Sequence, residues 1–93
     1  MSDQVQIRVT NHARMRLKQR VGLPKMSCQR HAERAFNKGM THAQARGKLK
    51  WYLDTLFMKY RTAHNIRVYG QFVYLFGYRC ELITVLVLPR DLK

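Results

Sequence analysis

Hydrophobic residues recur at three- and four-residue steps over the first two thirds of the chain, a spacing that predicts amphipathic helices. Thr10 or Asn11 is suited to cap the first helix, and Gly39 is predicted to end the second in a left-handed conformation. A capping box at residues 41–44 begins the third, which continues despite Gly47 in its first turns. The helices are therefore predicted at about residues 11–21, 25–38 and 41–60. Their apolar stripes are Ala13, Leu17 and Val21; Cys28, Ala32, Ala35 and Phe36; and Ala45, Leu49, Tyr52, Leu53, Leu56 and Tyr60.

After residue 60 the apolar period changes to two, which predicts strands. Turn residues, beginning with Gly70 and Gln71, divide the segment into a three-stranded antiparallel meander. Residues 5–9 also alternate and predict a short edge strand or an extended arm. The 93 residues are long enough for one domain. The predicted fold is α+β, with about three N-terminal helices packed on an antiparallel sheet of three to four strands. Its parts are an arm at residues 1–10, helices at 11–60 and the sheet at 66–89.

A two-residue loop at Gly70 and Gln71 fixes the predicted register of the first hairpin. It pairs Tyr69 with Phe72, Arg67 with Tyr74, and Asn65 with Phe76, all on one face. The other face carries Ile66, Val68, Val73 and Leu75. Because this second face is the more apolar, it is predicted to receive the helices, and Arg67 with its aromatic neighbours is predicted to line the opposite surface. The last strand is apolar on both sides except at Thr84, which indicates a central position or a partly covered second face.

The charge balance indicates a polyanionic partner. Eighteen Lys and Arg residues stand against five acidic ones, a formal net charge of +13, and such an excess repels itself in the folded state. The basic residues are spread along the chain rather than gathered beside a lipid-seeking helix, which favours nucleic acid over a membrane. Two cysteines, Cys28 and Cys80, are too few for a disulfide-framed secreted domain, so a cytoplasmic setting is expected. Their spacing has no zinc-site pattern, and no metal or cofactor is predicted.

The most informative polar pattern is on the first predicted helix, where His12, Arg16 and Arg20 follow at four-residue steps. An imidazole beside two fixed cations suits phosphate chemistry, because the cations disfavour its charged form and also hold a phosphate. We therefore predict that this stripe borders a functional cleft.

The sheet is predicted to supply the other half of that cleft. A guanidinium at Arg67 next to Tyr69 and Tyr74 offers both a phosphodiester contact and a surface on which a base stacks. Thr84 is interpreted either as a strand residue with a locally satisfied hydroxyl or as a phosphate ligand beside Arg67. His64 lies close to the proposed cleft, and the adjacent Asn65 is a candidate for orienting the substrate. His31 and His42 are assigned surface or capping roles.

The sequence resembles the barnase/EndoU/colicin/RelE group of small ribonuclease toxins. The resemblance rests on His12-Ala13, Arg16 and Arg20 opening a helix, and on Leu82-Ile83-Thr84-Val85 ending the sheet. The chain also resembles a set of small uncharacterised proteins from phages and bacterial mobile elements, through Ile66-Arg67-Val68-Tyr69-Gly70 and the last strand. Together the likeness spans most of residues 7–89.

The resemblance implies an RNA-binding endoribonuclease that works without metal, in which the RNA 2′-hydroxyl attacks the adjacent phosphate. In that scheme His12 is the base or the acid, and Tyr74 and Thr84 orient the phosphate or the base. Arg16, Arg20 and Arg67 stabilise the phosphorane, each contributing about 3 kcal/mol. The toxin likeness also implies a toxin–antitoxin setting, with an antitoxin or a host protein as partner. The long third helix departs from the smallest toxins, and only His64 or Tyr74 is available as a second proton-transfer group.

Two other interpretations fit the same pattern. Three helices and a hairpin also describe a winged-helix DNA-binding module, in which the third helix would begin as a recognition helix. Its reading residues would be His42, Gln44, Arg46 and Lys48. Alternatively, the protein binds RNA or blocks a host factor without catalysis, using the same cations and aromatic residues.

Overall fold

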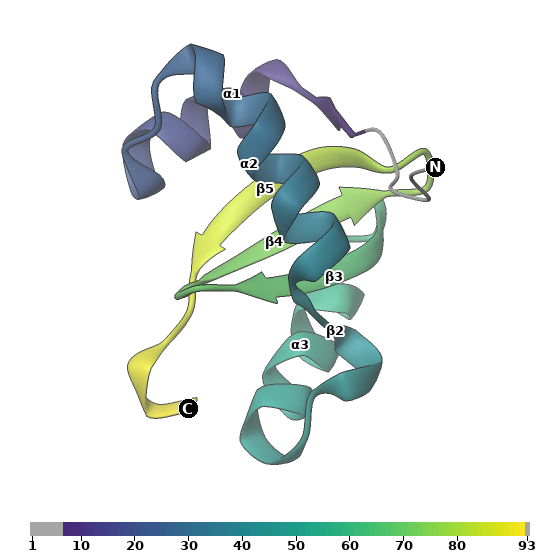
Figure 1. The fold of residues 1–93 in the computed structure, drawn as a ribbon. Helices are drawn as coiled ribbons and strands as arrows, with labels where there is room; N and C mark the ends of the chain where they lie inside the picture. The colour runs from purple at the N-terminus through teal and green to yellow at the C-terminus, as the bar shows by residue number, and fades with distance from the viewer. Residues whose placement is uncertain (1–6, 93) are drawn as a thin grey trace.

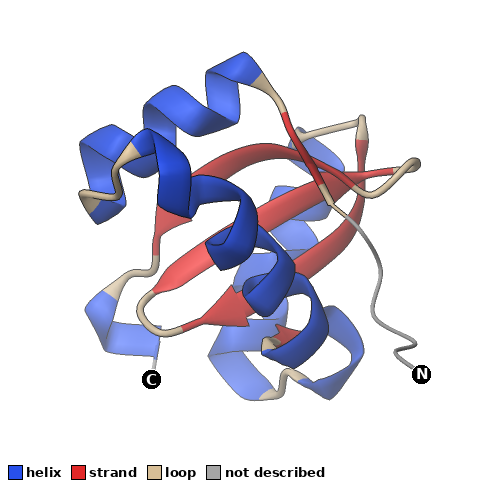
Figure 2. Ribbon diagram, turned by 45° about the horizontal axis from the view of Figure 1, so that its top comes forward, coloured by secondary structure: helices blue, strands red, loops and turns tan. Residues whose placement is uncertain are grey.

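Helices cover both faces of a five-stranded mixed sheet (Figures 1 and 2). The computed structural model describes residues 7–92, except the side chain of residue 25. The strands lie in the order β1-β5-β4-β3-β2, with β1 parallel to β5 and the other neighbours antiparallel. The α+β class is therefore confirmed. The elements are β1 Arg8–Val9, α1 Asn11–Arg16, the π-helix η1 Leu17–Val21, α2 Lys25–Lys38, β2 Met40–Thr41, the 3₁₀ turn η2 His42–Gln44, α3 Gly47–Lys59, β3 Ala63–Tyr69, β4 Phe72–Gly77, β5 Glu81–Val87 and the 3₁₀ turn η3 Arg90–Leu92.

The predicted hairpin register is confirmed: Tyr69 pairs with Phe72, Arg67 with Tyr74 and Asn65 with Phe76. Gly70 has φ +65°, a conformation that glycine adopts without the steric cost other residues carry. β5 lies between β4 and the short β1, which agrees with the interior position expected from its apolar character.

The sheet is covered on both faces, and the prediction that the Arg67 face is open was wrong. The α1, η1 and α2 stripes pack with Tyr74, Phe76, Leu82 and Val85 on that face, where Tyr74 and Phe76 are 0% exposed. α3 packs on the opposite face, the one that carries Ile66. Strands are spaced about 4.8 Å apart and packed helices about 8–10 Å apart, so one face of three long strands accommodates about two helices. The third helix therefore occupies the other face.

Two predictions about the region after α2 were also wrong. Gly39 is extended, with φ −72°, and not left-handed. Its place is set by close packing, because a Cβ there would lie 2.5 Å from the Ala35 carbonyl oxygen and 3.1 Å from that of Val68. The capping box at Thr41 and Gln44 is present, but it opens only the η2 turn. α3 starts separately at Gly47, whose φ of +63° breaks the helix predicted to run through it.

The edge of β5 is shared between a strand and a helix. β1 pairs with β5 only through Arg8 and Val9, as a parallel edge strand; residues 5 and 6 of the predicted strand lie outside the described residues. Thr10 Oγ1 then donates to the Leu82 carbonyl oxygen at 2.9 Å, and α1 begins. Within residues 7–92, the helices are all too short or too polar to cross a bilayer.

Candidate nucleic-acid interface

The predicted stripe on the first helix is only partly assembled. Thr10 Oγ1 accepts from the Ala13 amide, so the predicted cap is confirmed. His12 is exposed, and its Nε2 accepts a long hydrogen bond of 3.4 Å from Arg16 Nε. The next turn is a π-helix, with hydrogen bonds from residue i+5 to residue i. Arg20 lies in this π-helix and donates from Nη1 to the Val85 carbonyl oxygen at 2.7 Å. Arg20 therefore provides a hydrogen-bond donor to a carbonyl oxygen of β5 beyond the point where β1 ends.

Arg67 holds α2 on the sheet. Its Nε donates to the Phe36 carbonyl oxygen at 2.9 Å, and its guanidinium carbon lies 4.4 Å from the centre of the Phe36 ring. Burial lowers the pKa of Arg67, although a guanidinium stays charged at any physiological pH. A cation at the carbonyl end of a helix also interacts favourably with the helix dipole. These contacts assign Arg67 to the attachment of α2.

The predicted Tyr74 and Tyr69 meet a residue that was predicted to have only a surface or capping role, His31 of α2. The Tyr74 Oη and His31 Nε2 atoms are 2.5 Å apart. The rings of Tyr69 and Tyr74 lie 5.8 and 5.5 Å from the His31 ring. Three aromatic rings from α2, β3 and β4 thus form one cluster, which we call the His31 cluster.

The protonation states of the His31 cluster follow from burial. Burial raises the pKa of Tyr74, and the nearby Tyr69 adds to the effect, so the phenol keeps its proton. Burial also lowers the pKa of His31, with a further contribution from the charge of Arg34, so the imidazole is neutral at neutral pH. A buried hydroxyl needs an acceptor, and His31 Nε2 is the partner that the structure gives it. Tyr74 therefore donates to Nε2, and the proton of the imidazole lies on Nδ1.

Cations surround His31 on the outer surface of α2. A hollow of about 250 Å³ is lined by Leu23, Ser27, Arg30, His31 and Arg34. A second of about 200 Å³ is lined by Arg30, Glu33, Arg34, Asn37 and Lys38. Arg30 and Arg34 border both hollows and are exposed, and neither makes a hydrogen bond or ion pair within the described part of the chain. We call Arg30, His31, Arg34 and Lys38 the α2 surface.

The remaining predicted residues do not join this surface. Thr84 is 5% exposed and pairs with Leu75, on the sheet face that α3 covers, so the second of its two interpretations, a phosphate ligand beside Arg67, was wrong. The cause is a register shift in β4 and β5: Leu75 pairs with Thr84 but Phe76 pairs with Leu82, which leaves one extra residue in β5. Asn65 is half-buried in β3, and the exposed His64 has its ring 5.1 Å from that of Tyr78.

Sequence reasoning missed Arg30, His31 and Arg34, although one local signal was available. The predicted apolar stripe of α2 includes Ala32 and Ala35, and residues 31 and 34 flank it on the helix. A histidine at the border of an apolar stripe is half-buried once the helix docks, which is the position that perturbs a pKa. This pattern alone does not identify Tyr74 as the hydrogen-bond partner of His31, because Tyr74 lies 43 residues away in the chain.

The fold arrangement also separates this chain from a winged helix. A winged helix needs its three helices in one bundle, whereas α3 packs on the opposite sheet face from α1 and α2. Comparisons of the chain with protein-family models, curated proteins and solved structures found no match.

Proposed function

We propose that this protein binds single-stranded RNA through the α2 surface. The observation that carries the proposal is the pair of exposed arginines, Arg30 and Arg34, that border two hollows beside a neutral imidazole. A guanidinium binds phosphate with paired hydrogen bonds, and these two have no competing partner among the described residues. The net charge of +13 supplies the long-range attraction that a polyanion requires.

Two features favour a single strand over a duplex. The two adjoining hollows are small, and unstacked bases fit such sites, whereas paired bases do not leave the helix. Glu33, beside Arg34 in one hollow, disfavours continuous phosphate tracking along α2 and offers an acceptor for base amino groups. The likeness to small ribonuclease toxins supports RNA over single-stranded DNA.

Metal-independent RNA cleavage is a second candidate, favoured by the state of His31. In this reaction the 2′-oxygen forms a bond to the adjacent phosphorus as its proton leaves, and the bond from phosphorus to the 5′-oxygen breaks as that oxygen takes a proton. With Tyr74 donating to Nε2 and a proton on Nδ1, the imidazole has no free lone pair, so it takes the 2′-hydroxyl proton only when the ring turns away from Tyr74 and presents Nε2 to the substrate. Its lowered pKa keeps that nitrogen unprotonated near neutral pH. Arg30 and Arg34 would stabilise the charge of the phosphorane. On this proposal His31, and not His12, is the proton-transfer group.

Binding is tested by fluorescence anisotropy with a labelled single-stranded RNA, the same sequence as DNA, and an RNA duplex, at about 50 to 200 mM salt. We expect single-stranded RNA to bind best. The double variant R30Q/R34Q should reduce the slope of log affinity against log salt by about 1.4, because about 0.7 is lost per phosphate contact. The matched control is R46Q/R61Q, which removes two exposed arginines at the ends of α3. Equal losses in both variants, or a preference for duplex, would overturn the proposal.

Cleavage is tested separately, with EDTA present, by mass spectrometry of the RNA ends. We expect 2′,3′-cyclic phosphates from the wild type, their loss in His31→Asn and their persistence in His12→Asn. A substrate with a single 2′-deoxy position controls for the attacking group. An intact substrate under all conditions would refute cleavage and leave binding as the function, whereas loss only in His12→Asn would move the site to α1.

A further inference from the structure

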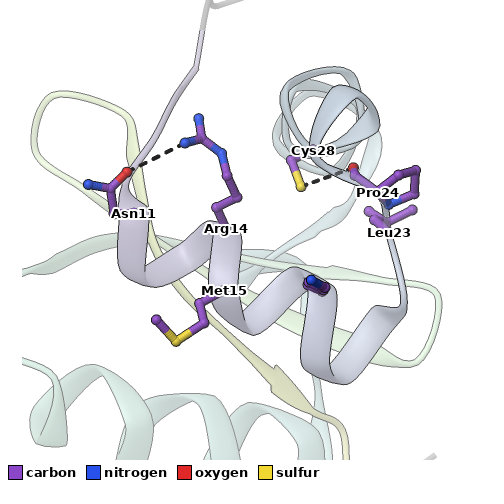
Figure 3. A pocket seen from close by; sticks show the side chains of 7 residues that line it. Asn11, Arg14, Met15, Leu23, Pro24 and Cys28 are labelled. Atoms are coloured by element: carbon purple, nitrogen blue, oxygen red, sulfur yellow. Dashed lines mark hydrogen bonds between the residues drawn. The ribbon is translucent and has the colours of Figure 1, made fainter.

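A hollow of about 530 Å³ lies between α1 and α2, next to the α2 surface, and we call it the Arg14 hollow (Figure 3). Its volume is in the range of small-molecule sites in proteins. Apolar and cationic side chains both line it. The lining residues are Asn11, Arg14, Met15, Lys18, Leu23, Pro24 and Cys28.

Arg14 is the chemically distinctive residue of this hollow. Its Nε is buried and has no hydrogen-bond partner within the described part of the chain. Its Nη1 reaches only Asn11 Oδ1, at 3.4 Å, which is long for a hydrogen bond to a guanidinium. Figure 3 shows the Arg14 side chain extending from α1 on the side where Leu23 and Pro24 lead into α2 and Cys28 lies in its first turn. Because Nε has almost no accessible surface, an anion in the hollow can contact Arg14 only through the terminal nitrogens of its guanidinium.

The other wall is suited to a planar apolar group. Leu23 and Pro24 present hydrocarbon, and Cys28, which is 1% exposed, has its thiol directed to the Pro24 carbonyl oxygen at 3.5 Å. Lys18 is exposed at the edge of the hollow. A ligand that fits both walls combines a flat, weakly polar body with an anionic group.

The position of the hollow identifies this ligand. Leu23 lines both the Arg14 hollow and the hollow at His31, so the two sites are neighbours that share a wall. We propose that the Arg14 hollow is a second nucleotide subsite, which holds the base of the adjacent RNA nucleotide against Leu23 and Pro24 and its phosphate on Arg14. This inference rests on the proposed binding of RNA and adds a base-reading position to it.

The test uses short RNA oligonucleotides in which one nucleotide at a time is abasic. We expect one position at which loss of the base weakens wild-type binding about tenfold, since base stacking typically contributes about this much. In Arg14→Gln the intact RNA should bind as weakly as the abasic one, so this difference disappears. Arg16→Gln, the same change on the same helix, should retain it. A melting curve for each variant confirms that the fold is intact.

The outcomes separate this inference from the proposed function. An abasic penalty that persists in Arg14→Gln, together with weaker binding by R30Q/R34Q, would overturn the second subsite alone. Failure of the wild type to bind any RNA would overturn both. A direct measurement follows the Arg14 Nε–H resonance by NMR during titration with uridine 3′-monophosphate or with octanoate. Saturation by the nucleotide supports the assignment, whereas a response to octanoate alone would show that the hollow takes an aliphatic anion.

Discussion

The hydroxyl of Tyr74 connects the buried sheet to the α2 surface, and Tyr74→Phe removes that single group. The phenyl ring still fills the same space in the core, where Tyr74 is 0% exposed, so no cavity is created. What is lost is the hydrogen bond to His31 Nε2, 2.5 Å away. The variant therefore isolates one polar contact between β4 and α2.

The expected loss of stability is set by what happens to His31 afterwards. An intramolecular hydrogen bond contributes about 1 kcal/mol net, and more when the remaining partner is left buried and unsatisfied. His31 is only half-buried, so water from the hollow at its side can reach the ring. We therefore expect about 1 kcal/mol of destabilisation, which for a domain of this length lowers Tm by about 4–8 °C.

The same change should act on the imidazole. A hydroxyl that donates to Nε2 stabilises the neutral ring, so Tyr74→Phe should raise the pKa of His31 from its lowered value toward the ordinary one. Urea unfolding followed by circular dichroism measures the stability, and an NMR titration of the His31 ring protons measures the pKa. Tyr78→Phe is the matched control, because Tyr78 is 79% exposed and its hydroxyl should contribute nothing. If Tyr74→Phe behaves like this control in both measurements, the His31 cluster is not held as described.

Three further predictions concern packing, the sheet edge and pH. Gly39→Ala should lower the free energy of unfolding in urea by about 2–3 kcal/mol, because the new Cβ meets the Ala35 backbone. At Gly22 a new Cβ has open space and only the φ of +82° opposes it, so Gly22→Ala should lower the free energy of unfolding by about 1 kcal/mol. A larger loss in Gly22→Ala than in Gly39→Ala would contradict this explanation. Arg20→Met should lower the free energy of unfolding by about 1–2 kcal/mol, because it removes the hydrogen bond to the Val85 carbonyl oxygen at the β5 edge. The control Arg16→Met should change the free energy of unfolding by less than about 0.5 kcal/mol. Equal melting temperatures for the two variants would show that the Arg20 contact contributes nothing. The pKa of His31 is lower in the folded protein than its ordinary value of 6.5, so as the pH falls below 6.5 the unfolded chain takes up the proton first. The free energy of unfolding therefore receives its full contribution from His31 above pH 6.5 and loses it as the pH falls toward the pKa of the folded protein. His31→Gln should flatten the stability profile between about pH 5 and 7, and an unchanged profile would assign the dependence to other groups.

Local patterns were sufficient for most of the secondary structure. The bounds of α2, Lys25–Lys38, are those that the apolar period and Pro24 predicted, and the hairpin register followed from one two-residue turn. The errors fall where a long-range contact decides the conformation. β2 has two residues and exists only because it pairs with β3. Gly39 gave the local signal of a left-handed cap, but in its extended conformation a Cβ would lie 2.5 Å from the Ala35 carbonyl oxygen and 3.1 Å from that of Val68, so the position requires glycine.

The candidate site was harder to predict, because it depends on which sheet face each helix covers. The period-two pattern identified which residues share a face of the sheet, but it did not show which helices pack on each face. Both faces are apolar enough to be buried. Arg67 and Tyr74 were therefore predicted to meet solvent, and they meet α2 instead. The predicted half-site on α1 lost Arg20 for a related reason: an open strand edge offered its guanidinium a carbonyl oxygen.

Because helices cover the sheet, the candidate reactive groups lie on the outer surface of α2 and not on the sheet itself. Tyr74 cannot contact a ligand from under α2, but its hydroxyl fixes the tautomer of His31, and His31 lines a hollow with Arg30 and Arg34. The core thus influences the protonation state of a surface imidazole, and on the proposed function the exposed cations beside it would attract phosphate. If the protein binds RNA, the affinity should depend on Arg30 and Arg34, and any cleavage on the contact between His31 and Tyr74. Tyr74→Phe should accordingly leave RNA affinity unchanged within about twofold while changing the pH dependence of cleavage, a separation that a purely structural role for Tyr74 would not produce.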